Sequence, residues 1–232
     1  MLECKPTDLA LLDQYQRIVL SQIQFDEDGQ HIQGYDPEVY MYLGFREEIE
    51  ETFGEDRHNP GYRRLGALLS IPLPEGGNVK TIPGDASPQA VDFHLKEFGD
   101  VSWYLANFLN IYGISMSEAV TQGEIAWDHD NQTSPKCDAE FSVQTERVFP
   151  LLKYAGYMHE LTGAFENVLR SATDETVAKL QPSAGKFVLS MAHILGSRLG
   201  ASYEEILAGN IAKIEKRIAD GTVFDKSGGD AR

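Results

Sequence analysis

Four carboxylates with matching spacing are the residues of this chain best suited to chemistry. Glu48 and Glu51 stand three residues apart in GFREEIEE, and Glu97 and Asp100 have the same spacing in HLKEFGDVSWYLANFLNIYG. Residues three apart on a helix are neighbours on one face, so the two acids of a pair can reach one cation. Carboxylate oxygens are ligands that Mg²⁺ and Mn²⁺ prefer. The pattern therefore predicts a Mg²⁺ or Mn²⁺ site with these four acids as ligands.

The surroundings of each pair distinguish a metal site from an ordinary solvated helix face. The helix after Asp100 is apolar on nearly every side, which indicates burial. A buried carboxylate is costly unless it is paired or bound to a metal. In the earlier segment two registers are open, Glu47 with Glu50 or Glu48 with Glu51. The second is favoured because Glu48 lies beside the apolar stripe of that helix, which consists of Met41, Tyr42, Phe45 and Ile49.

The composition limits the classes of function. The chain has 232 residues, of which 42% are apolar, and a net charge of −16, which is typical of an acidic globular protein. We expect no nucleic-acid binding, and an anionic substrate would need a divalent cation to mediate its binding. No apolar run of about 18 residues predicts a membrane span, and no signal-peptide pattern is evident. With only two, well-separated cysteines, the expected location is cytoplasmic.

Helical periodicity predicts an all-α fold. One helix includes Leu9, a second begins at Asp36-Pro37, and another is capped by Ser115 or Ser117. Further helices are expected over about 91–112, 146–171, 174–199 and 203–219. Residues 59–92 contain five prolines and are predicted to be a long insert with a short hairpin. Residues 128–140 are predicted to be a polar linker.

Two segments recur in the same order and suggest a duplicated unit. Residues 42–51 align with 154–163, and residues 111–127 align with 198–214. The second copy lacks most of the acids. Glu160 is opposite Glu48, but Gly163 is opposite Glu51. Counted without gaps from the shared glycines, Ala184 is opposite Glu97 and Phe187 is opposite Asp100. We therefore expect one metal site per chain.

These motifs resemble the MazG-like all-α nucleoside triphosphate pyrophosphohydrolases. LGFREEIEE followed by EFGDVSWYL is similar to the family's Glu-x-x-Glu and Glu-x-x-Asp signature, and LLDQYQ is similar to its opening helix. EEILAGNIAKIEKRIADG resembles its closing helix, with Asn210, Lys213 and Arg217 at matching spacing. The resemblance implies a four-helix-type bundle, a Mg²⁺ requirement and hydrolysis of a nucleoside triphosphate to monophosphate and pyrophosphate. It also implies that Tyr104, Lys213 and Arg217 contact the substrate.

The chain looks like a tandem form of this family. We expect a catalytic repeat at 1–130, which carries the insert, and a degenerate repeat at 146–232 packed on it pseudo-symmetrically. The basic residues of the closing helix occur only in the second copy, so the two copies would share one active site. Glu48 or Glu51 would act there as general base on a metal-bound water. Whether the chain forms a homodimer is left open.

Other functions remain open from the sequence. The acids could hold a structural ion in a non-catalytic helical interaction module. The enzyme could also act on a non-standard nucleotide or a histidine-pathway intermediate, since the motifs select neither base nor sugar. A di-iron site is set aside, because such bundles use two Glu-x-x-His motifs and this chain has one, at Glu55 and His58.

Overall fold

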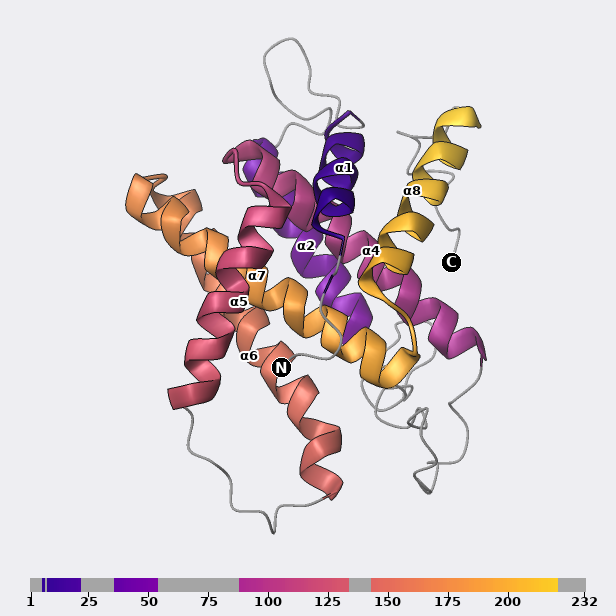
Figure 1. Ribbon diagram of the computed structural model, residues 1–232. Coiled ribbons are helices and arrows are strands. Elements are labelled where there is room, and N and C mark those ends of the chain that lie inside the picture. Colours follow the sequence, from indigo (N-terminus) through magenta and orange to yellow (C-terminus); the bar gives the residue numbers. More distant parts are fainter. Residues whose placement is uncertain (1–5, 7, 22–35, 54–87, 134–142, 221–232) are drawn as a thin grey trace.

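The computed structural model describes residues 6, 8–21, 36–53, 88–133 and 143–220, and over these residues the protein is all-helical, as predicted (Figure 1). None of the described helices is both long and apolar enough to cross a membrane. The elements are α1 (Leu9–Leu20), α2 (Pro37–Phe53), α4 (Pro88–Ile111), α5 (Met116–Thr133), α6 (Val143–Arg170), α7 (Asp174–Ile194), the π turn η1 (Leu195–Leu199) and α8 (Tyr203–Ala219).

The predicted helices are confirmed to within a few residues, with two corrections. The predicted linker at 128–140 is wrong in its first part, because α5 continues to Thr133. Helix α4 begins at Pro88, inside the predicted insert, since proline at the first helical position loses no hydrogen bond. Ser115 is the residue that caps α5, and its hydroxyl accepts from the Glu118 N–H at 3.2 Å. The predicted hairpin lies outside the described residues.

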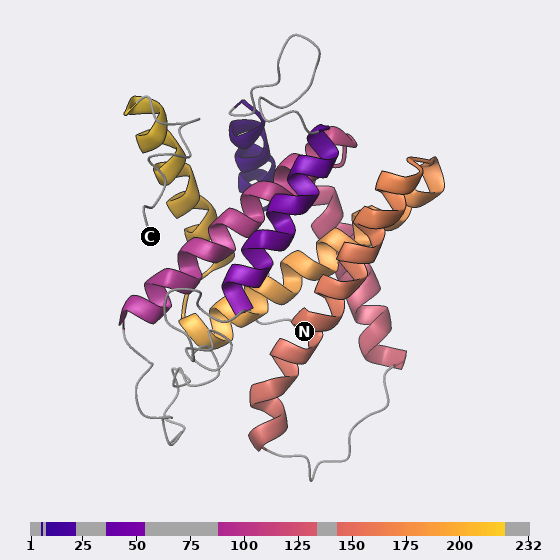
Figure 2. The same cartoon turned by 180° about the vertical axis from the view of Figure 1, so that it is seen from behind.

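Two buried helices, α4 and α7, organise the fold. Helices α2 and α8 pack on α4, whereas α6 and α5 pack on α7 (Figures 1 and 2). The chain therefore crosses over, because α5 follows α4 in the sequence but packs on α7, and α8 follows α7 but packs on α4. Both halves contribute to one core, in which the Phe45 ring lies 5.1 Å from that of Phe165 and 5.5 Å from that of Phe187. The two-repeat interpretation stays a prediction.

Helix α1 is held in place by polar side chains that form hydrogen bonds with backbone groups of the turn between α4 and α5. The buried Gln16 donates to the Ile114 carbonyl at 2.7 Å and accepts from the Met116 N–H at 2.9 Å. Asp13 accepts from the Ser117 N–H at 3.1 Å, which satisfies one of the free donors at the start of α5. Both side chains belong to LLDQYQ, so this motif holds α1 against its neighbours.

The π turn at the end of α7 has no counterpart in α4. The N–H of Gly200 bonds there to the carbonyl of Leu195, five residues back. Gly200 has φ 64°, and Gly113, which follows α4, has φ 65°, a left-handed conformation that glycine adopts without steric cost. A π turn accommodates one more residue than an α turn. Positions on α7 counted back from Gly200 are therefore displaced by one relative to positions on α4 counted back from Gly113.

The contact between α5 and α7 depends on two glycines and gives a first prediction. A Cβ atom on Gly185 would lie 1.8 Å from the Ala119 carbonyl oxygen, and one on Gly123 would lie 2.3 Å from the carbonyl carbon of Gly185. We expect Gly185→Ala to lower the free energy of unfolding by about 1–3 kcal/mol, because the helices must move apart. Gly209→Ala is the control, since an added Cβ there meets nothing within 4 Å. Equal stability of the two variants in urea denaturation would contradict this packing.

Candidate metal centre

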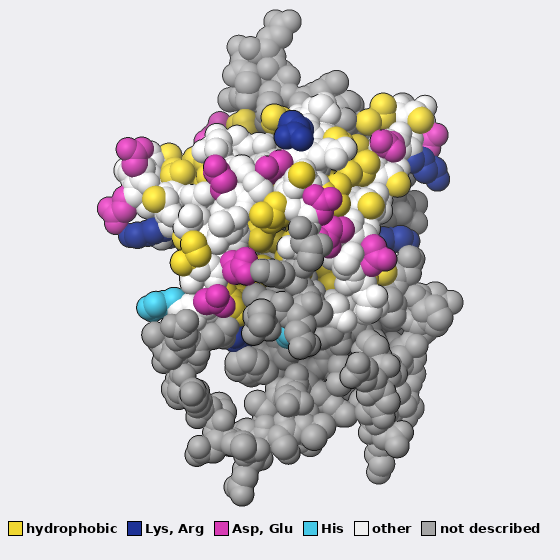
Figure 3. Space-filling view, in the orientation of Figure 1, with side chains coloured by type: hydrophobic (Ala, Val, Ile, Leu, Met, Phe, Trp, Pro, Cys, Tyr) yellow, Lys and Arg dark blue, Asp and Glu magenta, His cyan; other side chains and the backbone are white. Residues whose placement is uncertain are grey.

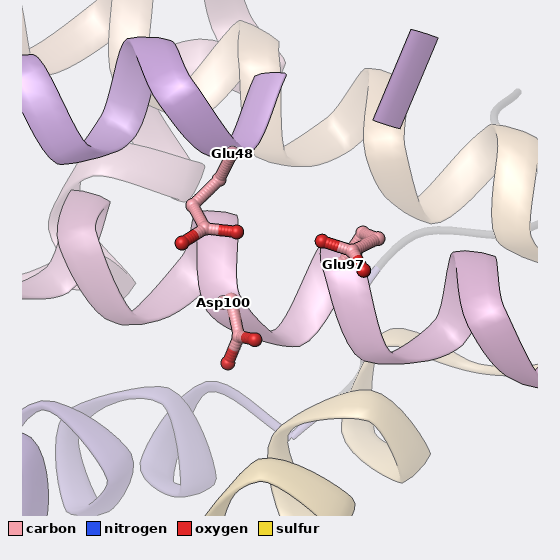
Figure 4. Close-up of side chains that lie close together, drawn as sticks. All are labelled: Glu48, Glu97 and Asp100. Carbon is pink, nitrogen blue, oxygen red and sulfur yellow. The ribbon is translucent and has the colours of Figure 1, made fainter. Parts of the chain in front are cut away.

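Glu48, Glu97 and Asp100 converge at the seam between α2 and α4. Each contributes one carboxylate oxygen to a group in which these atoms all lie within 4.8 Å of one another. Figure 4 shows Glu48 reaching from α2 toward the two acids of α4. Glu97 is only 3% exposed, and the other two residues are partly buried. The structure thus brings together three of the four predicted ligands from two helices that are far apart in the sequence.

The close approach of α2 and α4 creates this convergence. The helices run antiparallel, so that Glu48 faces Asp100 while Gly44, one turn earlier, faces Tyr104. A Cβ atom on Gly44 would lie 2.0 Å from Cε1 of Tyr104, so the absence of a side chain is what admits the ring. The apolar stripe of α2 is directed into the core and leaves Glu48 at the edge of the seam; its members are the buried Met41, Tyr42, Phe45 and Ile49.

The other acids of α2 lie where the favoured register puts them. Glu47 and Glu50 are exposed. Glu51 is partly buried and does not belong to the three-carboxylate group, but its charge acts on Glu48. Its role as a ligand stays a prediction.

Tyr104 lies one turn beyond Asp100 on α4 and forms part of the seam. Its ring centroid is 6.2 Å from that of Tyr40 and 4.9 Å from that of Trp103. Burial, followed by the influence of Tyr40 and Glu48, raises the pKa of its hydroxyl, so the group stays protonated. The packing over Gly44 gives Tyr104 a structural role, and its predicted contact with substrate remains a prediction.

The acidic group concentrates negative charge where little water can reach it. Burial, and after it the charges of Asp100, Glu97 and Glu51, together raise the pKa of Glu48 from 4.5 to about 9, while Lys213 opposes the shift. In the metal-free protein Glu48 therefore holds a proton at neutral pH. A divalent cation can replace that proton and balance the carboxylates together. Hard oxygen donors presented by two packed helices suit Mg²⁺ or Mn²⁺.

Helix α8 supplies the partners of Asp100. Lys213 Nζ lies 2.5 Å from Oδ2, and Asn210 Nδ2 donates to Oδ1 at 3.0 Å. Asn210 in turn accepts from the hydroxyl of the buried Tyr15 at 2.8 Å, so α1, α4 and α8 meet at this carboxylate. The sequence predicted Lys213 as a substrate contact but did not predict its pairing with Asp100. Tyr15 was missed as a supporting residue, although it stands in the LLDQYQ motif.

Figure 3 shows acidic side chains spread over one face of the molecule, with few basic ones between them. Arg217 lies one turn beyond Lys213 at an exposed position on α8. Its predicted contact with substrate remains a prediction.

No family model matches the chain, and no match is found among curated proteins or solved structures. The resemblance to the MazG-like family therefore remains a prediction from its motifs. The structure adds the convergence of three carboxylates and the lysine that meets them.

The raised pKa of Glu48 predicts how the metal-free protein responds to pH. Its folded-state pKa is about 9, whereas its ordinary value is 4.5, so between pH 4.5 and 9 the folded protein binds a proton that the unfolded protein does not. The free energy of unfolding therefore falls as the pH rises through this interval. Glu48→Gln removes this dependence. At pH 8 in the presence of a chelator, we expect the free energy of unfolding of this variant to exceed that of the wild type by about 1 kcal/mol or more. Each kcal/mol corresponds to a rise of roughly 2–4 °C in melting temperature.

Thermal unfolding between pH 5 and 9 measures this effect. Glu47→Gln is the matched control on the exposed side of α2 and should follow the wild type. A wild-type curve parallel to that of Glu48→Gln over the whole range would show that Glu48 is not buried with a raised pKa. In Mn²⁺ the order of stabilities should reverse, because only the wild type gains from the ion.

Proposed function

We propose that the protein is a Mg²⁺- or Mn²⁺-dependent hydrolase that converts a nucleoside triphosphate to monophosphate and pyrophosphate. The observation that carries the proposal is the convergence of Glu48, Glu97 and Asp100 beside Lys213. Carboxylates that hold Mg²⁺ usually leave part of its shell to water and substrate phosphates. A lysine at the same place offsets phosphate charge that the ion leaves uncompensated. The order of the motifs along the chain supports the substrate class.

In this proposal the residues of the chain hold the reactants and move one proton. A bound divalent ion would polarise the phosphoryl oxygens and lower the pKa of a water. Glu48, Glu97 and Asp100 provide its ligands, and Glu48 or Glu51 accepts the proton of the attacking water. The water oxygen bonds to the α-phosphorus while the bond from that phosphorus to the bridging oxygen breaks. Pyrophosphate leaves with the bridging oxygen and its electron pair.

Lys213 has two successive partners in this scheme. Without the ion, its ammonium group neutralises Asp100. When a cation binds Asp100, the ammonium group is released to a phosphate oxygen of the substrate. Asn210 keeps its hydrogen bond to the other oxygen of Asp100 and holds the carboxylate in place, with Tyr15 behind it.

A structural ion in a non-catalytic helical module is the competing function. It is favoured by one observation, namely that Asp100 joins α4 to α8 and α1 through Asn210 and Tyr15, so an ion there would brace three helices. The two functions differ in a measurable product, because only the enzyme releases pyrophosphate. A screen of standard and damaged nucleoside triphosphates, and of a histidine-pathway intermediate, with pyrophosphate detection would identify the base and sugar.

Neutralising each acid tests the site. We expect Glu48→Gln, Glu97→Gln and Asp100→Asn, and also Glu51→Gln, to reduce kcat by about 100-fold or more, because each removes a charge from the metal centre. Glu47→Gln and Glu50→Gln on the exposed face should retain most of the activity. Near-normal rates in any two of the four site variants would refute the assignment. A wild type that binds Mn²⁺ without releasing pyrophosphate would favour the structural module.

Removing the charge of Lys213 tests its contact with phosphate. Lys213→Ala should reduce kcat/KM by about 10–100-fold, the size expected for a lost charged hydrogen bond. Its affinity for Mn²⁺ should be unchanged or higher, since the ammonium group no longer competes for Asp100. Lys216→Ala, at an exposed position of the same helix, is the control. Full activity of Lys213→Ala would remove this residue from the mechanism. Arg217→Ala tested in the same assay would show whether that residue also contributes.

A further inference from the structure

A second charged cluster lies between α5, α6 and α7. The side chain of Lys186 on α7 is only 11% exposed, and its Nζ lies 2.6 Å from Oε2 of Glu160 on α6 and 3.3 Å from Oδ2 of Asp130 on α5. Ser183, one turn earlier on α7, donates to Oε1 of Glu160 at 2.9 Å. The ammonium group also lies 5.1 Å from the ring centroid of Tyr157, within the range of a cation–π contact. The proposed reaction uses none of these residues.

This cluster occupies positions that correspond to those of the acidic group. Glu160 is opposite Glu48 in the aligned segments 42–51 and 154–163. On α7 the π turn adds one residue, so the positions opposite Glu97 and Asp100 become Ser183 and Lys186. The sequence-based alignment with Ala184 and Phe187 is therefore displaced by one residue, and both of those residues are fully buried in the core.

Helix contacts support the corrected alignment independently. Gly99 precedes Asp100, and a Cβ atom on it would lie 3.1 Å from the side-chain nitrogen of Asn210 on α8. Gly185 precedes Lys186 and packs against Gly123 on α5. Gly123 is the residue opposite Asn210 in the aligned segments. The contact of α4 with α8 and the contact of α7 with α5 thus involve corresponding positions.

The charge is reversed at one of these corresponding positions, where Asp100 of α4 is opposite Lys186 of α7. The ion-pair partners do not correspond, because the residue opposite Lys213 is Ala126. Asp100 of α4 pairs with Lys213 of α8, whereas Lys186 of α7 pairs with Asp130 of α5. We infer that the second cluster is a charge-reversed counterpart of the acidic group, in which the ammonium group of Lys186 takes the place of a divalent cation. This half of the protein is then held together by a tethered cation and binds no metal, while the acidic group depends on an ion from solution.

The tethered cation has a physical advantage for a supporting element. A lysine in the chain balances Glu160 at any metal concentration. The Lys186 side chain is 11% exposed whereas those of Glu160 and Asp130 are 41% exposed, so the acids compensate the charge of a mostly buried ammonium group. The inference concerns metal binding and stability only. It therefore holds or fails whether or not the protein is a pyrophosphohydrolase.

Restoring the acids tests the inference directly. Ser183→Glu with Lys186→Asp, made in the Glu48→Gln/Asp100→Asn background, should bind one additional Mn²⁺ per chain, measured by electron paramagnetic resonance of free Mn²⁺. Ala178→Glu with Lys179→Asp makes the same charge change earlier on α7 and should add none. No gain of Mn²⁺, or a variant that is unfolded in Mn²⁺ as well as in chelator, would overturn the inference. Tight Mn²⁺ binding retained by the background alone would instead contradict the first site.

Removing the tethered cation provides a second test. Lys186→Met should lower the melting temperature by several degrees, equally in chelator and in Mn²⁺, and adding Glu160→Gln should recover part of the loss. Lys179→Met is the matched control, because Lys179 makes an equally short but exposed pair with Glu175 at 2.6 Å. A Lys186→Met variant as stable as Lys179→Met would show that the cluster does not support the fold.

Discussion

Glu48, Glu97 and Asp100 share a seam in which Glu97 is buried and the other two are partly buried, and the helices around them supply either apolar packing or compensating charge. Burial, and after it the charges of Asp100, Glu97 and Glu51, raise the pKa of Glu48, so this group holds a proton at neutral pH in the metal-free protein. Lys213 and Asn210 meet Asp100 from the opposite side. A divalent cation would resolve the remaining imbalance, so the need for positive charge links the stability of this seam to its proposed chemistry.

Helices α5 and α8 each pack on the other half of the chain, so residues from both halves meet at this seam. Helix α8 comes from the C-terminal half but packs on α4, and it carries the residues that contact Asp100. Helix α5 from the N-terminal half packs on α7 and contributes Asp130 to the second cluster. Each charged cluster therefore makes an ion pair that joins the two halves. Helix α8 of the other half thus supplies the partners of Asp100, and an active site shared by both halves stays a prediction.

The two clusters show alternative ways of balancing a carboxylate that lies between packed helices. Around Glu160 the positive charge is covalently attached through Lys186, and the seam needs nothing from solution. Around Glu48 the neighbouring residues are acids, and a proton or an ion would supply the balance. A tethered ammonium group cannot leave room for substrate oxygens as a hydrated Mg²⁺ does. Of these two clusters, only the acidic group would leave that room for the substrate of the proposed reaction.

The sequence by itself determined the helices, the favoured register of the acids on α2 and the two carboxylate pairs, because helical periodicity and three-residue spacing are local properties. It did not determine the pairing of Asp100 with Lys213 or the support from Tyr15, which depend on how α8 and α1 pack on α4. It aligned Ala184 and Phe187 with Glu97 and Asp100, whereas the inferred alignment, which counts the π turn after α7, uses Ser183 and Lys186. That turn is visible only in the hydrogen bonds of the folded chain. Those contacts join residues up to 195 positions apart, and only tertiary packing could decide them.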